Sequence, residues 1–158
     1  MKTIHADFTT IKYPVGDYIQ YNIPIIKYMG DKIKLILIEK KLNTDAQINL
    51  ICSGSSGAII ASIIATILYD KFEKVCIRYI KKDGENSHGF SYMCSEWFKG
   101  FNIIVDDFIT TGATMKYIFN KINNNTKVDL IAVSEIDCDW LNSINYLRKK
   151  KVGILLTK

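Results

Sequence analysis

The stretch FNIIVDDFITTGATM, residues 101–115, joins a short apolar run directly to two adjacent aspartates and a group of threonines. The run at residues 103–105 predicts a buried strand, which places Asp106 and Asp107 at its carboxyl end. Two neighbouring carboxylates repel each other, and their burial is unfavourable unless hydrogen-bond donors or cations lie opposite them. A vicinal diol, such as the 2′- and 3′-hydroxyls of a ribose, offers two donors at a matching spacing. The alternative interpretation is a helix-capping aspartate beside a surface aspartate.

The residues after the aspartate pair are typical of an anion site. They are Thr110, Thr111, Gly112, Ala113 and Thr114, and a helix is expected to follow over residues 113–123. The first N–H groups of a helix have no partners within it, and they carry the positive end of the helix dipole. Together with the hydroxyls and a glycine, they predict a cradle for a phosphomonoester. N-capping by one threonine is the simpler alternative, but a cap needs only one hydroxyl.

Strands and helices alternate along the rest of the chain. The apolar pattern predicts strands at residues 48–52, 74–80, 128–133 and 152–156, and helices at residues 58–70 and 139–150. The first third is less regular: residues 17–27 contain Pro24 and suggest an edge strand or an irregular layer, whereas residues 31–42 favour a helix. The alternation predicts an α/β fold, a mostly parallel twisted sheet with helices on both faces. A length of 158 residues corresponds to a single domain, 1–158.

A second loop with the composition of an anion site follows the strand expected at residues 48–52. It contains Ser53, Gly54, Ser55 and Ser56, and we expect a tight loop over residues 53–57. Glycines let the backbone approach an anion, and successive N–H groups form a concave nest. No lysine follows the second glycine, so this is not a Walker A loop, and GxSxG is absent. An ordinary strand-to-helix turn is the alternative.

A third loop, KKDGENSHG at residues 81–89, is polar and contains two glycines. It includes Lys81, Lys82 and His88, which are able to neutralise an anion or pass a proton. A solvated hairpin is the simpler interpretation of these residues taken alone.

Composition limits the class of protein. Hydrophobic residues make up 48% and charged residues 23% of the chain, as in an ordinary globular protein, and the net charge of +5 fits an anionic ligand. The four cysteines form no CxxC or Cys/His cluster, so a zinc site is not expected, and Cys52 and Cys76 are expected to be buried thiols. No signal-peptide pattern and no apolar run long enough to cross a bilayer is found, so we expect a reducing, cytoplasmic setting without membrane association.

The segment IIVDDFITTGATM, residues 103–115, resembles the signature of the type I phosphoribosyltransferases, which bind 5-phosphoribosyl-1-pyrophosphate (PRPP). The resemblance implies that Asp106 and Asp107 hold the ribose hydroxyls and that residues 110–114 hold the 5′-phosphate. Residues 53–56 stand one strand-helix-strand unit earlier, and they resemble the loop that binds pyrophosphate in this family.

The loop at residues 81–89 is similar in kind to the flexible loop of orotate phosphoribosyltransferases, which carries lysines and a His-Gly pair. The resemblance implies that Lys81 contacts pyrophosphate and that Lys82 and His88 take part in catalysis. The spacing differs, and Glu85 or Asn86 stands near the place of a further lysine.

The implied activity is a Mg²⁺-dependent transfer of the phosphoribosyl group from PRPP to a nucleobase nitrogen, in nucleotide synthesis or salvage. Orotate is slightly favoured as acceptor, and a purine stays open. Mg²⁺ is expected to be held through PRPP and water near the two aspartates, without direct protein ligands. We expect residues 1–34 to form a small hood over the base and residues 46–158 to form the core, with a homodimer as the assembly.

Two other functions are compatible with parts of the sequence. A regulator that binds PRPP or a nucleotide and contacts nucleic acid needs the same loops without catalysis, although the mild charge makes nucleic acid an unlikely partner. An ATP-binding protein would also place aspartates after a strand, but it would need the missing Walker A lysine.

Overall fold

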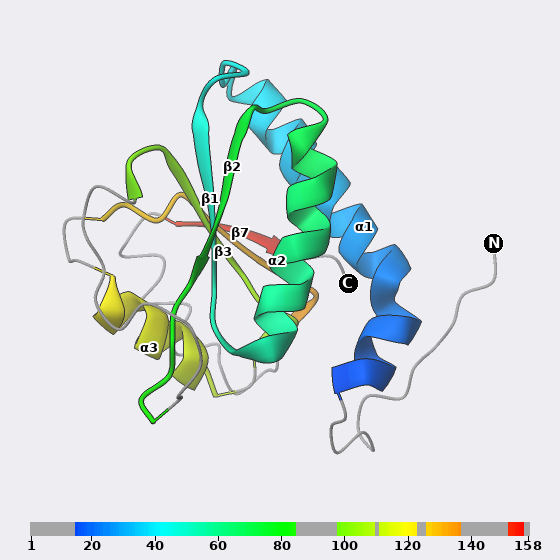
Figure 1. The fold of residues 1–158 in the computed structure, drawn as a ribbon, viewed down its shortest axis with the longest axis vertical. Helices are drawn as coiled ribbons and strands as arrows, with labels where there is room; N and C mark the ends of the chain where they lie inside the picture. Colours follow the sequence, from blue (N-terminus) through cyan, green and yellow to red (C-terminus); the bar gives the residue numbers. More distant parts are fainter. Residues whose placement is uncertain (1–14, 85–97, 110, 123–125, 137–151, 157–158) are drawn as a thin grey trace.

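Five parallel strands form the central sheet of the computed structural model, which describes residues 15–84, 98–109, 111–122, 126–136 and 152–156 (Figure 1). The strand order is β2-β1-β3-β5-β7, and a second, two-stranded parallel sheet pairs β4 with β6. The strands are β1 Gln47–Cys52, β2 Lys74–Tyr79, β3 Phe101–Val105, β4 Phe108–Ile109, β5 Leu130–Val133, β6 Glu135–Ile136 and β7 Gly153–Leu156. The described helices are α1 Val15–Glu39, α2 Gly54–Tyr69 and α3 Ala113–Lys121.

Both faces of the sheet are covered, which confirms the expected α/β fold. Helices α1 and α2 lie side by side against one face, and α3 lies against the other (Figure 1). Successive residues of the buried strands point to opposite faces of the sheet. Leu50 and Ile103 belong to the apolar cluster under α1 and α2, whereas Ile104 belongs to the cluster under α3. This alternation is the two-residue period of a strand buried on both sides.

The expected edge strand at residues 17–27 is wrong, because this segment belongs to α1 and Pro24 lies inside the helix. Ile26, Met29, Ile33 and Leu37 recur every three or four positions, and each is at most 2% exposed. Packing of this stripe outweighs the helix hydrogen bond that Pro24 lacks. The helix expected at residues 31–42 is confirmed as the second part of α1. The expected hood, residues 1–34, therefore overlaps the core from Ile26 onward, while residues 1–14 lie outside the described part.

Helix α2 begins at Gly54, four residues before its expected start, so residues 54–57 form its first turn and only Ser53 remains as the N-cap. The prediction of a tight loop over residues 53–57 is therefore wrong for residues 54–57, which are helical. The strands expected at residues 48–52, 74–80, 103–105, 128–133 and 152–156 are confirmed within two residues. The helix expected at residues 139–150 lies outside the described residues.

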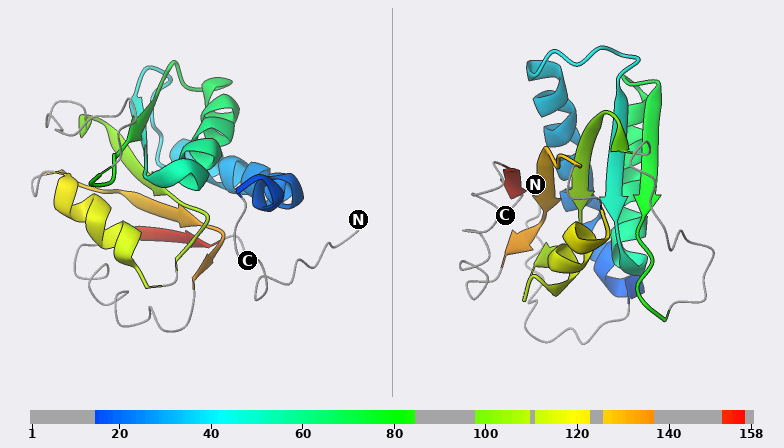
Figure 2. Two further views of the ribbon diagram at one scale, coloured as in Figure 1. Left: turned by 60° about the horizontal axis from the view of Figure 1, so that its bottom comes forward. Right: turned by 90° about the vertical axis from the view of Figure 1, so that its left-hand side faces the viewer.

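The strand order fixes where a ligand can bind. The chain passes from β1 to β2 on one side and later returns to β3 on the other side of β1, so the order reverses between β1 and β3. The carboxyl ends of parallel strands meet at one edge, and the reversal leaves a crevice there that neither crossover helix fills. Figure 2 shows this edge, where α2 and α3 both begin.

A buried amide network fixes the opposite end of the same two strands. Asn49 in β1 donates from Nδ2 to Oδ1 of Asn102 in β3 at 2.9 Å, and its own Oδ1 accepts a hydrogen bond from Nε of Arg78 at 3.1 Å. Nδ2 of Asn102 donates to the carbonyl oxygens of Phe98 and Lys127, both at 2.9 Å. Both asparagines are at most 2% exposed, so the network stabilises the β1–β3 register without help from bulk water.

Replacing Asn102 by alanine is expected to lower the free energy of unfolding by about 2–3 kcal/mol, because several buried polar groups lose their partner. Urea denaturation measures this change. The matched control is Asn43→Ala, at an exposed position, with an expected change below about 0.5 kcal/mol. Equal effects of the two substitutions would contradict a stabilising role of the network.

Candidate functional site

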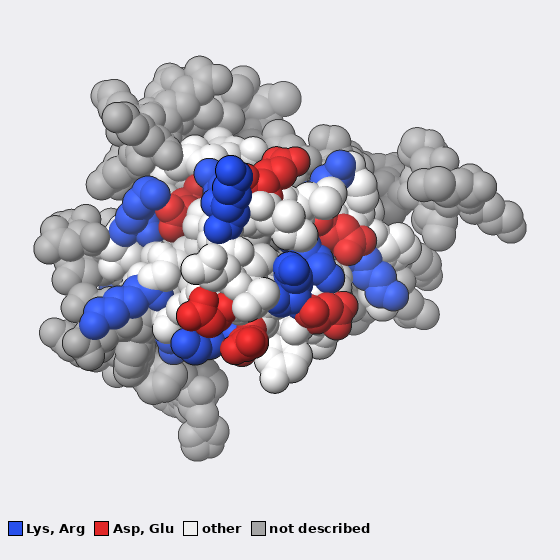
Figure 3. All heavy atoms as spheres, turned by 90° about the horizontal axis from the view of Figure 1, so that it is seen from above, with Lys and Arg blue, Asp and Glu red and all other residues white. Residues whose placement is uncertain are grey.

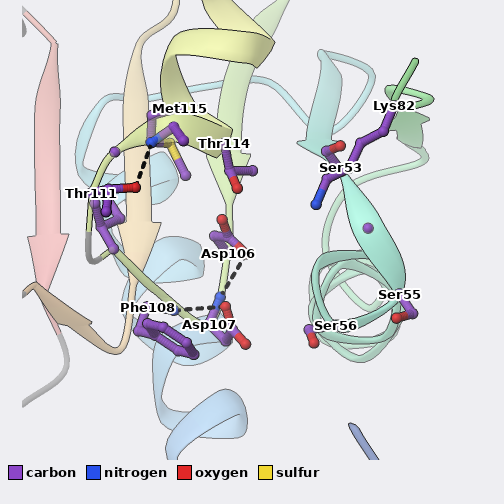
Figure 4. Close-up of a pocket in the computed structure, with 14 residues that line it drawn as sticks. Ser53, Ser55, Ser56, Lys82, Asp106, Asp107, Phe108, Thr111, Thr114 and Met115 are labelled. Carbon is purple, nitrogen blue, oxygen red and sulfur yellow. Dashed lines mark hydrogen bonds between the residues drawn. The ribbon is translucent and has the colours of Figure 1, made fainter. Parts of the chain in front are cut away.

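A cavity of about 380 Å³ opens at the carboxyl ends of β1 and β3 (Figure 4). Two groups of residues face each other across it: the start of α2 with Lys82 on one side, and the aspartate pair with the start of α3 on the other. Its lining is formed by Ser53, Gly54, Ser55, Ser56, Lys82, Asp106, Asp107, Phe108, Ile109, Thr111, Gly112, Ala113, Thr114 and Met115.

The first turn of α2 presents uncapped N–H groups at the cavity. Ser53 has an extended backbone, and its hydroxyl donates to the carbonyl oxygen of Ile80 at 2.8 Å instead of capping the helix. This bond ties the end of β1 to the residue after β2. No acidic residue lies in the first turn of α2. The positive end of the helix dipole therefore stays available to an anion in the cavity.

Two glycines allow close approach in this turn. Gly54 has φ +74°, in the left-handed region that L side chains rarely adopt, and a Cβ there would lie 3.6 Å from Nζ of Lys82. A Cβ on Gly57 would lie 3.3 Å from Cβ of Cys52 and 3.8 Å from Oδ1 of Asp106. Gly57 thus lets the start of α2 lie directly against the end of β3.

Asp106 and Asp107 are each 7% exposed, and backbone hydrogen bonds hold them. The N–H of Asp107 donates to Oδ1 of Asp106 at 3.0 Å, and the N–H of Phe108 donates to Oδ1 of Asp107 at 2.8 Å. The carbonyl oxygen of Asp107 accepts hydrogen bonds from both the N–H and the hydroxyl of Ser134. The carboxylates are therefore fixed by the chain before any ligand binds.

Burial raises the pKa of Asp106 well above its usual range, and the neighbouring charge of Asp107 raises it further, whereas Lys82 acts in the opposite direction. Burial also raises the pKa of the Cys52 thiol to about 12, with Asp106 as a second cause. Cys52 is thus a buried, protonated thiol at neutral pH and no nucleophile, as expected. Cys76, expected to be buried, is only half-buried because β2 lies at the edge of the sheet.

The start of α3 forms the second anion-binding element. Gly112 is the N-cap residue with φ 71°, and no side chain caps the helix there. The hydroxyl of Thr111 accepts a hydrogen bond from the N–H of Ala113 at 3.3 Å, which tightens the turn. Residues 111–115, which form this turn, line the same cavity as the α2 turn, and Figure 4 shows the hydroxyl of Thr114 there. Two helix N-termini therefore converge on one space.

The structure brings most of the residues selected from the sequence into this cavity. Lys81 is not among the lining residues, and Tyr117 of α3 holds its carbonyl oxygen at 2.8 Å. Thr110 and His88 lie outside the described residues. Sequence reasoning missed an apolar wall of Phe108, Ile109 and Met115. The sequence indicated these three residues only by their position: Phe108 and Ile109 stand between the aspartate pair and the threonines, and Met115 follows the last threonine.

The chemistry of the lining suits a hard divalent cation that binds together with a phosphorylated ligand. Carboxylate oxygens of Asp106 and Asp107 and the hydroxyl of Thr114 are the oxygen donors that Mg²⁺ prefers. Among the described residues, no group of three or more His, Cys, Asp or Glu forms a metal cluster of its own. None of the described helices has the length and apolar character needed to cross a membrane.

These features define a doubly covered parallel sheet with an anion-binding crevice beside a buried aspartate pair. No family model and no curated protein matches the sequence. The chain is similar to a solved structure of an adenine phosphoribosyl transferase from Trypanosoma brucei in complex with AMP, pyrophosphate and ribose-5-phosphate. The TM-score is 0.60 and the sequence identity is 14%. The similarity covers 90% of this chain and 68% of that chain.

Two further solved structures are similar with TM-scores of 0.49. One is an orotate phosphoribosyltransferase from Aeropyrum pernix, with 18% identity over 71% of this chain and 59% of that chain. The other is an HGPRT-ase from Leishmania tarentolae in complex with GMP, with 16% identity over 71% of this chain and 63% of that chain. The T. brucei structure supports the fold: this chain has the fold of the type I phosphoribosyltransferases, as the signature at residues 103–115 led us to expect.

Replacing Asp106 by asparagine is expected to stabilise the protein, increasingly so as pH rises above the ordinary pKa of an aspartate. The raised pKa means that the unfolded chain ionises first, so wild-type stability falls with rising pH through this range. The asparagine keeps the oxygen that accepts the N–H of Asp107 but carries no charge. Thermal unfolding at a series of pH values measures the difference, with Asp45→Asn, at an exposed carboxylate, as control. A difference that does not vary with pH would contradict burial of the Asp106 charge as its cause.

Proposed function

We propose that the protein is a Mg²⁺-dependent phosphoribosyltransferase, which transfers the 5-phosphoribosyl group of PRPP to a ring nitrogen of a nucleobase and releases pyrophosphate. One observation carries the proposal: a buried aspartate pair lies in a single cavity with the uncapped N-termini of two helices. PRPP has a diol between two phosphate groups, so its chemistry matches this order of sites.

Each of three groups of lining residues binds one part of the substrate. Thr111, Thr114 and the first N–H groups of α3 bind the 5′-phosphate. Asp106 and Asp107 accept hydrogen bonds from the ribose hydroxyls, and these donors favour the ionised carboxylates. The first turn of α2, with Lys82 beside it, receives the pyrophosphate.

The same arrangement stabilises the charges that develop during transfer. As the bond from C1 to pyrophosphate breaks, positive charge grows on the ribose and negative charge grows on the leaving group. The fixed carboxylates of Asp106 and Asp107 supply negative potential to the ribose, whereas Lys82 and the α2 dipole face the leaving group. Mg²⁺, when bound near Asp106 and Asp107 through PRPP and water, supplies further neutralisation of the pyrophosphate charge.

The acceptor base has an apolar surface available in Phe108, which is half-buried, whereas Ile109 and Met115 are at most 3% exposed. Orotate is proposed first because of the lysines and the His-Gly pair at residues 81–89, and a purine is the second candidate. The homodimer and the cytoplasmic setting are proposals that accompany this function. Figure 3 shows Lys and Arg interspersed with Asp and Glu among the described residues at the amino ends of the strands, so this face has no continuous basic surface for nucleic acid.

The test is release of pyrophosphate from PRPP and Mg²⁺ across a panel of nucleobases that includes orotate, adenine, hypoxanthine, guanine and uracil. We expect release that depends on one base. Replacing both Asp106 and Asp107 by asparagine is expected to lower turnover by roughly 10²-fold or more, because the preorganised negative potential is lost.

The control for the double variant changes two exposed carboxylates, Asp31→Asn with Asp45→Asn, and should keep full turnover. Circular dichroism verifies that both variants fold. PRPP binding without release for any base would favour a regulator, and absence of PRPP binding would refute the proposed substrate.

A further inference from the structure

We propose that Tyr117, assisted by Lys121, is a positioning residue that holds the carbonyl oxygen of Lys81 and the side chain of Asp83, the two neighbours of Lys82, so that the ammonium group of Lys82 faces the pyrophosphate end of the cavity. The role of Lys82 toward pyrophosphate rests on the proposed function. The clamp itself rests on contacts between α3 and residues 81–83.

Three contacts define the clamp. The phenol oxygen of Tyr117 lies 2.8 Å from the carbonyl oxygen of Lys81 and 3.0 Å from Oδ1 of Asp83, so its hydrogen is shared between two acceptors. Nζ of Lys121 lies 2.9 Å from the same oxygen of Asp83 and 5.2 Å from the ring centre of Tyr117. The residues before and after Lys82 are therefore both attached to α3.

Lys82 is an exposed residue, so burial does not fix its backbone, and the contacts of its two neighbours with α3 limit how that backbone can move. Its side chain nevertheless lines the cavity and lies beside Gly54, with Nζ 3.6 Å from the Cβ position of that glycine. In Figure 4 the Lys82 side chain extends from the segment after β2 toward Ser53. A lysine side chain has many rotamers, and fixing its backbone reduces the number of positions that its ammonium group can reach.

Helix α3 connects this clamp to the other end of the substrate. Ala113, Tyr117 and Lys121 are spaced by four residues and so lie along one side of the nine-residue helix. Its first turn lines the proposed 5′-phosphate site, and its next two turns hold residues 81–83. One rigid element thus sets the distance between the two phosphate-binding ends.

The contacts contribute little to global stability, which separates a positioning role from a structural one. The ion pair is exposed, with relative side-chain exposures of 37% for Lys121 and 79% for Asp83. Exposed pairs of this kind contribute little to the free energy of unfolding. Loss of the ion pair should therefore hardly change thermal unfolding, and a positioning role of the partly buried Tyr117–Lys81 hydrogen bond is recognised by an effect on pyrophosphate binding that ribose 5-phosphate binding does not share.

The experiment compares wild-type protein with Tyr117→Phe, which removes only the phenol oxygen. We expect the KM for PRPP and the Kd for Mg²⁺-pyrophosphate to rise about fivefold, the effect of one lost hydrogen bond. The Kd for ribose 5-phosphate, which lacks the pyrophosphate, should not change. Tyr69→Phe, at a tyrosine that is 69% exposed, is the matched control. Lys121→Met tests the second contact, with Lys116→Met on the same helix as its control.

A double-mutant cycle identifies the residue through which Tyr117 acts. In a Lys82→Met background, Tyr117→Phe should have no further effect on pyrophosphate binding. Additive effects, or an unchanged Kd in Tyr117→Phe, would overturn the clamp. If wild-type protein binds pyrophosphate with this coupling but does not turn over PRPP, the clamp stands and the proposed function fails. If wild-type protein binds neither, both fail.

Discussion

The direct contact between the first turn of α2 and the end of β3 is the constraint on which the site depends. At Gly57 no side chain separates the helix from Val105 and Asp106. A Cβ there would lie 3.3 Å from Cβ of Cys52, closer than an ordinary contact, so a larger residue would require Cys52 or α2 to shift. The strand order produces the crevice, but this close contact sets its width.

The electrostatics of the crevice are balanced only when a ligand is present. The two helix N-termini and Lys82 attract anions, whereas the buried carboxylates of Asp106 and Asp107 repel them and also each other. A simple phosphate satisfies one side only. In the function proposed above, the hydroxyl donors of PRPP would lie against the carboxylates and its two anionic groups against the helix N-termini, so the charges of the crevice would favour this ligand over a simple anion.

Much of this could be predicted from the sequence, since the buried strands carry apolar runs and the polar loops follow them directly. The position of Asp106 and Asp107 at the carboxyl end of a buried strand was predictable because they directly follow the apolar run at residues 103–105. The helical state of residues 17–27 was not, because Pro24 and loose alternation oppose it locally, and only packing of Ile26 and Met29 against the sheet reveals it. The contact of Tyr117 with Lys81 was equally hidden, since 36 residues separate the two partners and neither belongs to a motif that joins them.

The pairing of β1 with β3 also has a consequence for the order of folding. Ile48 lies opposite Phe101, and α2 and β2 come between them along the chain. Contacts between distant parts of the chain form slowly, because the intervening loop must close before they are gained. The α2 turn and the aspartates are therefore brought together only when this long-range pairing is made. A nascent or partly folded chain that has formed only its local helices contains each half of the crevice separately and cannot yet bind a ligand that needs both.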